Sequence, residues 1–310
     1  MSTYSTKAVN QAFYDQITSD DHGMQKNAQQ AVNEFTRVKM REDGFWRKII
    51  PPVPITNDEL DRQVDTDKNV KIVDKEPGSP AAVSIPYATL PMNRYIRGPR
   101  YRVMFDRIVT PRFTKDIDEL RTWDMDIRQV LSDNAIKDML AEEDGKAIRC
   151  VNTLLGTVNT QVPETATVQY KTISGGITRE TFNEALKIMP STPSHLETST
   201  LLMNNITVKD LQKWGRDEIG GDLAEEILLK GYSESTFLNT RILVTIKRDL
   251  VPDSTFFMFA EPKFLGKFFV LEDTTMAIER KFYLLEFFAY ESIGSAIGNV
   301  AGLARADFTA

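Results

Sequence analysis

The first fifty residues carry a helical pattern of apolar positions that is preceded by a polar stretch. The apolar residues recur at roughly helical spacing until Gly44 interrupts them: Ala28, Ala31, Val32, Phe35, Val38 and Met40. Residues 1–23 are polar and lack a sustained apolar face. A short helix is only marginally stable alone in water. The pattern therefore predicts an N-terminal helical arm, residues 1–50, that lies on another part of the protein or on a neighbouring molecule.

A proline-rich segment follows, because nine of the fourteen prolines fall between residues 51 and 111. Proline fixes φ and lacks a backbone N–H, so this segment must run extended. Three pieces of it have the composition of strands: residues 69–73, 81–87 and 100–109. In the last piece Tyr101, Val103 and Phe105 share one face. We expect residues 51–114 to form a long two-stranded excursion, which needs a surface to lie upon because an isolated ribbon is barely stable in water.

The strongest helical pattern begins after the last of these prolines. Thr114 or Asp116 can cap a helix here, and Asp116 and Glu119 stand at the spacing of a capping box. One apolar stripe follows: Ile117, Leu120, Trp123, Ile127, Val130, Leu131, Ile136, Met139 and Leu140. The pattern resumes after Gly145 and reaches Leu155. A helix of about 35 residues would span about 50 Å, which is longer than most globular helices and suggests a spine.

The next block alternates strand and helix patterns. Residues 165–173 read as a strand, after which Thr178 is placed to cap a helix. Residues 197–203 read as a second strand that leads into a helix capped by Thr207, and Asp222 opens a third helix. This order predicts a small α/β lobe.

The final eighty residues are rich in β-branched and aromatic residues and are expected to be strands. Four segments carry the pattern: residues 240–251, 254–262, 267–273 and 277–292. If the last segment is one strand, Ile278, Phe282 and Glu286 share one face, while Tyr283 and Phe287 share the other. Both faces then mix charge with apolar bulk. Such a strand suits a region that crosses an intermolecular contact.

Composition narrows the classes of protein that these elements can build. A chain of 310 residues with 41% hydrophobic and 26% charged residues is that of a folded protein, and its length favours two lobes with extensions. The net charge of −6 argues against a globally basic nucleic-acid binder. No apolar run approaches the ~20 residues of a membrane span, so we expect a soluble protein made in a cytoplasm. Cys150 is the only cysteine and lies in an apolar helical pattern, which predicts a buried structural thiol.

Residue patterns that carry catalysis are missing from the sequence. No phosphate-binding glycine loop, nucleophile elbow, HExxH or CxxC pattern occurs. The two histidines have no partner at metal-ligand spacing. The pair Glu142 and Glu143 lies on a helical face, where solvated charge is the usual state of carboxylates. We therefore expect no catalytic residue, no metal, no cofactor and no enzymatic activity.

Residues 94–115 combine positive charge with interleaved aromatic side chains. Six arginines lie in this segment: Arg94, Arg97, Arg100, Arg102, Arg107 and Arg112. Basic and aromatic residues together are typical of nucleic-acid binding. Arginine also makes forked contacts to carboxylates across protein interfaces, and residues 58–76 contain seven acidic residues. In an acidic protein we favour contacts between subunits, with nucleic-acid contact and a solvated surface as alternatives.

Taken in order, these parts resemble the major capsid proteins of tailed bacteriophages, whose fold is named after the Hong Kong 97 phage shell. Three stretches of sequence carry the likeness. They are LLMNN at residues 201–205 before a helix, MFAEPKFLGKFFV at residues 258–270, and the ending YESIGSAIGNVAGLARADF. The order of parts covers nearly the whole chain.

The resemblance implies an α+β fold in which arm and loop are devices of assembly. It divides the chain into a helical arm (1–50), an extended loop (51–114), a peripheral domain with the spine helix (115–174), an axial domain (175–270) and terminal peripheral strands (271–310). Copies of the chain would gather as hexamers and pentamers into an icosahedral head around double-stranded DNA, assembled in the cytoplasm of a host bacterium. Scaffolding, portal and decoration proteins are further expected partners, and no membrane is.

Other readings remain open. An encapsulin-type nanocompartment resembles phage capsids but packages proteins, and the long arm before the loop favours the phage. A soluble enzyme with its site in the α/β lobe is a rival from a different class, as is a nucleic-acid-binding module built on the arginine-rich segment.

Overall fold

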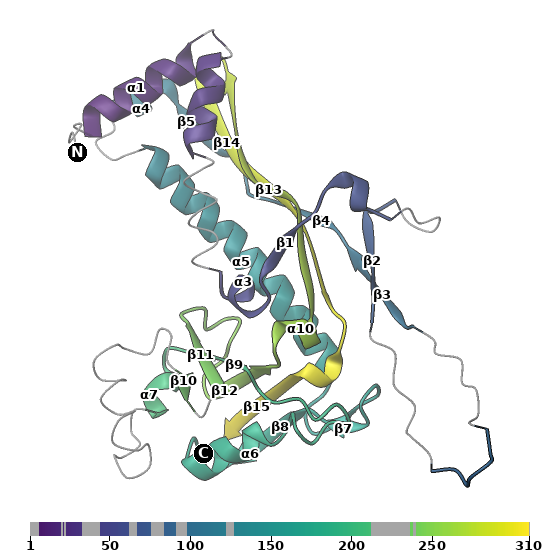
Figure 1. Ribbon diagram of the computed structural model, residues 1–310. Coiled ribbons are helices and arrows are strands. Elements are labelled where there is room, and N and C mark those ends of the chain that lie inside the picture. Colours follow the sequence, from purple (N-terminus) through teal and green to yellow (C-terminus); the bar gives the residue numbers. More distant parts are fainter. Residues whose placement is uncertain are drawn as a thin grey trace.

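A computed structural model describes residues 6–19, 21, 23–32, 44–61, 67–75, 84–90, 98–121, 127–211, 236–237 and 240–309. The molecule is elongated (Figure 1). A long helix runs beside a long β-hairpin, a mixed lobe lies at one end of both, and a two-stranded ribbon projects to one side. The fold is α+β, as the sequence predicts.

The long helix α5 (Ile127–Leu155) has 29 residues and continues through Gly145 without a break. It buries a stripe that includes Ala135, Met139, Ile148 and Val151, so the predicted spine is confirmed. Cys150 is exposed, so the prediction of a buried thiol was wrong. Cys150 directly precedes Val151 of the buried stripe but is not part of the stripe itself. None of the described helices is long and apolar enough to cross a membrane.

The start of the spine differs from the prediction. Residues 113–116 form strand β5 (Phe113–Asp116), which pairs with the long hairpin. Helix α4 (Ile117–Arg121) begins only after it, where the Asp118 N–H donates to Asp116 Oδ1 at 2.8 Å. Trp123 lies outside the described residues. Pairing with the distant strand β14 thus holds residues 113–116 in a strand, although their sequence also suits helix capping.

The N-terminal region is helical, with α1 (Thr6–Thr18) followed by a helix at residues 23–32. Phe13 and Ile17 are buried, so α1 does have an apolar face, contrary to our expectation for residues 1–23. These helices lie at the far end of the hairpin (Figure 1). Gln29 Nε2 donates to the carbonyl of Ile278 at 3.2 Å, which shows that this region folds back on its own chain. The predicted helical positions Phe35, Val38 and Met40 lie outside the described residues.

The long hairpin forms the centre of a five-stranded sheet. Its strands are β13 (Gly266–Lys281) and β14 (Leu284–Ile297), flanked by β1 (Pro52–Pro54), β4 (Asp106–Val109) and β5. Lys281 pairs with Leu284, so Phe282 and Tyr283 form a two-residue turn. The prediction of a single strand through residues 277–292 was therefore wrong. The turn has no glycine or asparagine to mark it, and Phe282 adopts φ 57°, held by the long ladder on either side.

The lobe is built on a six-stranded sheet. Its order is β10 (Thr236–Phe237), β11 (Thr240–Thr245), β9 (Thr200–Asn204), β12 (Thr255–Phe259), β15 (Leu303–Thr309) and β8 (Tyr170–Ser174). Every residue of β12 is buried. Phe257 and Phe259 face the core shared with α5, whereas Phe256 and Met258 face a second core. Helices α6 (Arg179–Leu186) and α7 (Thr207–Leu211) contribute to that second core.

The sheet is assembled from segments that are far apart in sequence. Strands β8 and β15 belong to the same sheet as β9, although they lie outside residues 175–270. The chain enters the lobe, leaves it to form the hairpin and returns for its last strand.

Helix caps in the lobe follow the sequence in one case and differ in another. Thr178 caps α6 through a capping box, as predicted. Asn204, not Thr207, caps α7, because its Oδ1 accepts from the Thr207 N–H at 2.7 Å. The Thr207 hydroxyl instead accepts from the Ser254 N–H at 2.9 Å. The helix expected at Asp222 lies outside the described residues.

The predicted excursion is a ribbon of β2 (Val70–Asp74) and β3 (Arg100–Met104), paired antiparallel. The face predicted to be apolar packs inward, since Val103 and Phe105 are buried against Ile55 and Phe269. Residues 84–87 form no strand, so that part of the prediction for residues 81–87 was wrong, and residues 81–83 lie outside the described part. Smaller elements are the hairpin β6 (Gln161–Val162) and β7 (Thr167–Val168), helix α10 (Pro262–Leu265), and 3₁₀ turns at Asn57–Glu59 and Val300–Gly302.

Candidate inter-subunit surface

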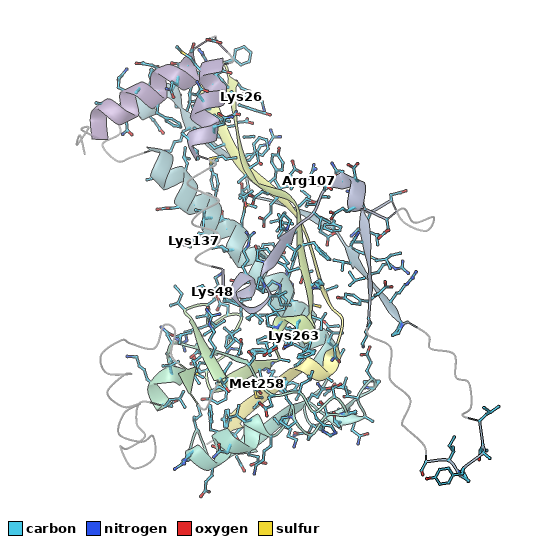
Figure 2. All side chains as sticks on the ribbon, viewed as in Figure 1. Lys26, Lys48, Arg107, Lys137, Met258 and Lys263 are labelled. Carbon is cyan, nitrogen blue, oxygen red and sulfur yellow. The ribbon has the colours of Figure 1, made fainter. Side chains whose placement is uncertain are left out.

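Four of the six predicted contact arginines lie in the described part of the chain. Arg100 and Arg102 are on β3, Arg107 is on β4, and Arg112 precedes β5; all four are exposed. Arg94 and Arg97 lie outside the described residues. Figure 2 shows Arg107 beside the middle of the long hairpin, where the ribbon joins the sheet. The four described arginines thus lie on or beside three different strands.

Two of these arginines frame aromatic side chains on the outer face of β14. Arg107 lies 5.6 Å from the ring centre of Tyr290, and Arg112 lies 5.3 Å from that of Phe288. The two rings are 6.3 Å apart. We call these four residues the outer stripe. Both aromatic residues are half-buried.

The arginines also have acidic neighbours within the same chain. Arg107 lies 3.4 Å from Glu272, and Arg112 lies 3.0 Å from Glu286. Arg100 lies 2.7 Å from Asp74. Exposed ion pairs of this kind contribute about 0–1 kcal/mol each, so the arginines can exchange these partners for others at little cost. Their role in contacts between subunits stays a prediction.

The turn of the long hairpin exposes two large apolar side chains that the sequence reading had placed inside a strand. Phe282 is 90% exposed and Tyr283 is 65% exposed. In the loop between β2 and β3, Tyr87 and Leu90 are also exposed. Large apolar side chains at the ends of projecting elements are typical of contact surfaces. Recognising Phe282 and Tyr283 would have required locating the turn, which carries no sequence signal.

A cleft of about 540 Å³ separates the ribbon from the lobe. Three lysines line it, namely Lys75, Lys263 and Lys267, together with Glu164 and Tyr101. Burial raises the pKa of Tyr101 above its usual value. Among the described residues no group of three His, Cys, Asp or Glu side chains could hold a metal ion.

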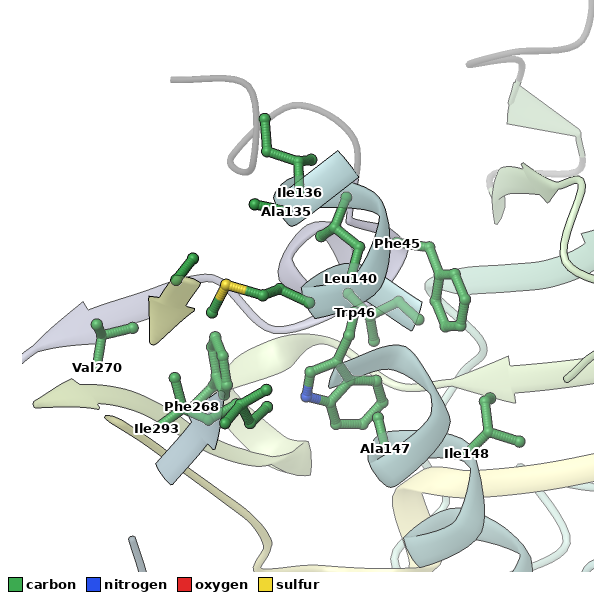
Figure 3. Close-up of a cluster of buried hydrophobic side chains, with 14 of the residues drawn as sticks. Phe45, Trp46, Ala135, Ile136, Leu140, Ala147, Ile148, Phe268, Val270 and Ile293 are labelled. Carbon is green, nitrogen blue, oxygen red and sulfur yellow. The ribbon is translucent and has the colours of Figure 1, made fainter. Parts of the chain in front are cut away.

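The segment that precedes the ribbon is fastened by a short helix, α3 (Phe45–Ile49), which the sequence reading did not identify. Trp46 lies against α5 near Leu140 and Ala147, with Phe268 of the hairpin on its other side (Figure 3). Its indole N–H donates to Ser295 Oγ at 3.2 Å. Its backbone N–H donates to Asp144 at 3.1 Å.

Next to Trp46, Arg47 is buried between two carboxylates. Its Nε donates to both oxygens of Glu143, at 3.1 and 3.0 Å, and its Nη2 donates to Glu291 Oε2 at 2.9 Å. The prediction that Glu142 and Glu143 are both solvated was therefore wrong for Glu143. The apolar stripe of α5 could have revealed it, because position 143 lies on the same face as Leu140 and Ala147.

We compared the chain with known protein families, sequences and structures. No protein-family model matches the sequence, and no curated protein sequence matches it. Solved structures do match along most of the chain. The mature capsid of bacteriophage PhiM1 has 8% identity and a TM-score of 0.58, with 86% of this chain and 87% of that chain covered.

Two further structures match about equally well. A virus-like particle from Pyrococcus furiosus has 15% identity and a TM-score of 0.57, over 89% of this chain and 98% of that chain. The capsid of the native GTA particle has 13% identity and a TM-score of 0.57, over 85% and 89%. The chain thus has the fold of tailed-phage capsid proteins, the Hong Kong 97 type, as its sequence resemblance predicts. At these low sequence identities the structural likeness shows the fold alone.

Proposed function

We propose that this chain is a major capsid protein that assembles with copies of itself into an icosahedral phage head around double-stranded DNA. The observation that carries the proposal is a capsid fold matched over most of both chains. The projecting ribbon and hairpin turn support it, because their exposed apolar side chains gain burial only from neighbours. The protein would then reside in the virion, after assembly in the cytoplasm of the host bacterium.

Electron microscopy of the purified protein tests this proposal. We expect closed particles of tens of nanometres, or capsomer-sized oligomers by light scattering if a scaffolding partner is required. Repeated interfaces of ordinary size are enough to drive such closure. A compact monomer that persists at high protein concentration, with and without other virion proteins, would contradict the shell function.

The second candidate is the shell of an encapsulin-type nanocompartment. The observation that favours a compartment is the match to a virus-like particle, which covers 98% of that chain. The helices at residues 6–32, which precede the ribbon, favour the phage head. Particles purified from the natural host distinguish the two functions: nuclease-protected double-stranded DNA supports the head, whereas a stoichiometric protein cargo without DNA supports the compartment.

The parts of the chain receive roles under this proposal. The arm (1–50) and the loop (51–114) would reach neighbouring subunits. The segments 115–174 and 271–310 would form the periphery of each capsomer, apart from β8 and β15, which belong to the sheet of the lobe. Residues 175–270 would gather around its axis in hexamers and pentamers. Scaffolding, portal and decoration proteins are proposed as further partners, and packaged DNA would be contacted without sequence specificity.

The outer stripe gives the proposal a residue-level test. Replacing Arg107→Glu together with Arg112→Glu should reduce particle yield at least ten-fold, because carboxylates of a neighbour would then meet like charge. The matched control is Arg149→Glu, an exposed arginine on α5 that also pairs with a glutamate of its own chain. Particle yield is measured by sedimentation, and the unfolding midpoint shows that the subunit is intact. Equal particle yields for both variants would show that the outer stripe is not part of the interface.

A further inference from the structure

The cluster around Arg47 holds more negative than positive charge inside the protein. Arg47 is 7% exposed, Glu143 is 2% exposed and Glu291 is fully buried. The three residues come from α3, α5 and β14, so the cluster joins the N-terminal segment to both the spine helix and the hairpin. One guanidinium serves two carboxylates.

The surrounding groups in the described part of the chain do not restore the balance. Asp144, on α5, pairs with Lys247, whose Nζ donates to Asp144 Oδ2 at 2.6 Å. On β13, Thr274 donates its hydroxyl proton to Glu291 Oε2 at 2.9 Å, and the half-buried Asp273 adds another negative charge nearby. Among the residues that the structure describes, two cations thus face three buried carboxylates even without Asp273.

The hydrogen bonding of Glu291 is incomplete as well. Its Oε2 accepts from both Arg47 and Thr274, whereas its Oε1 is buried and has no partner among the described residues. An ionised carboxylate with one oxygen left without a donor is unfavourable in the interior. The cluster is therefore more stable when one of the two carboxyls carries a proton.

The pKa values have the direction that this geometry requires. Burial raises the pKa of Glu143 to about 7, an effect that the charge and hydrogen bonds of Arg47 only partly offset. Burial also raises the pKa of Glu291 above its usual value, again against the opposing effect of Arg47. Burial likewise raises the pKa of Asp144, which Lys247 opposes.

We propose that Arg47, Glu143 and Glu291 form a proton-controlled fastening for helix α3. While the two carboxyls share one proton, α3 stays docked between α5 and the hairpin. Loss of that proton to water leaves an unbalanced buried negative charge and favours undocking of α3, which exposes the carboxylates to solvent. The proposal stands on this cluster alone and does not depend on the shell function.

The sign of the pH dependence follows from the raised pKa. The undocked carboxyl titrates near its ordinary value, so docking is strongest below about pH 4.5 and weakens as the pH rises through about 7. One proton linked in this way makes the docked state roughly ten-fold less favoured at pH 8 than at pH 6. A fastening that depended on fully ionised pairs would have the opposite sign.

Hydrogen exchange of the full chain, followed by mass spectrometry, tests the proposal. The readout is the exchange of the amides in residues 44–50, corrected for the intrinsic pH dependence of exchange. The Ile50 N–H, bonded to the Trp46 carbonyl at 2.9 Å, is one of them. We expect protection to fall roughly ten-fold from pH 6 to pH 8, while that of β12 is unchanged.

Glu143→Gln should abolish this pH dependence, because a glutamine can still accept from Arg47 but cannot ionise. Glu142→Gln is the matched control: Glu142 is the next residue on the same helix, is exposed and pairs with Arg149, so the parent profile should persist. A flat profile in the parent chain overturns the proposal whether or not the variant folds. An unchanged profile in Glu143→Gln overturns it too.

Discussion

Several individual residues in this molecule are specified by close contact with strands that lie far away in the sequence. Gly266 opens β13, and a Cβ atom there would lie 2.3 Å from the carbonyl oxygen of Ala296. Gly298 faces the ring of Tyr101, and its Cβ would lie 2.6 Å from that ring. Side chains are therefore excluded at both positions, because the neighbouring backbone or ring occupies the space.

Gly266→Ala should lower the free energy of unfolding by about 1–3 kcal/mol, because the clash is with backbone that cannot move without disturbing the ladder. Gly98→Ala is the control, since no heavy atom lies within 4 Å of a Cβ at that position. Chemical denaturation measures both variants. Equal midpoints would show that the start of β13 adjusts freely.

Arg47→Leu should be more damaging, because it leaves Glu143 and Glu291 buried without a counter-charge. We expect a loss of about 3–5 kcal/mol in the free energy of unfolding, measured by chemical denaturation at pH 7. Lys48→Leu, the half-buried neighbour in the same helix, should change it by less than about 1 kcal/mol. A loss in Arg47→Leu no larger than in Lys48→Leu would contradict a structural role for the cluster.

Sequence predicts individual residues well where one element decides their environment. The alternation through Val103 and Phe105 correctly gives the buried face of the ribbon, and Thr178 is the cap that it was expected to be. Prediction from the sequence fails where two elements that are far apart along the chain meet. The apolar face of α5 indicates that Glu143 points inward, but its partner Arg47 comes from a segment 96 residues away, and no local pattern encodes that partner.

At the scale of elements, the spine, the ribbon and the strand-rich ending are predictable because their periodicity is local. The turn at Phe282–Tyr283 and strand β5 are not. Both depend on β14: it pairs with β13 across the turn, and with residues 113–116 along its other edge. Long-range pairing overrides helix and strand propensities at these places. The candidate surface shares this limit, since the outer stripe exists only once β14 lies beside β4 and β5.

The loop at the end of the ribbon can be removed without changing the hydrophobic core, so its role can be tested separately. The Lys75 N–H donates to the Pro99 carbonyl at 2.8 Å, so the chain closes there. Replacing residues 76–98 by a two-residue Asn-Gly turn should keep β2 and β3 paired and leave circular dichroism and the unfolding midpoint unchanged.

The same variant should nevertheless fail to form particles, because the segment removed includes the exposed Tyr87 and Leu90. Electron microscopy provides the readout. Normal particles from this variant would show that the loop is not an assembly device. A parallel variant, with Tyr87→Ser and Leu90→Ser in the intact loop, separates loss of apolar contact from loss of length.

At the scale of the whole molecule, two cores meet at one strand. β12 faces the spine core with Phe257 and Phe259 and the lobe core with Phe256 and Met258. Beside it, β15 contributes Ala304, Ala306 and Phe308 to the lobe core and separates β12 from β8. The cores are therefore expected to unfold together as one cooperative unit.

Removing residues 303–310 should abolish this cooperative unfolding, since β8 loses its partner and the lobe core is opened. We expect an aggregating or molten product by size-exclusion chromatography and near-ultraviolet circular dichroism. Removal of residue 310 alone is the control and should behave as the parent does. A monodisperse truncated chain with a sharp unfolding transition would show that β15 is dispensable.

The position of β15 also sets an order of events during synthesis. Strands β8 and β12 cannot be joined until residues 303–309 leave the ribosome, although β8 emerges more than a hundred residues before them. The parallel pairing of β8 with β15 closes a long loop, and such contacts form slowly. The lobe should therefore mature only after residues 303–309 have been made, so chains interrupted before them would be left without a finished lobe.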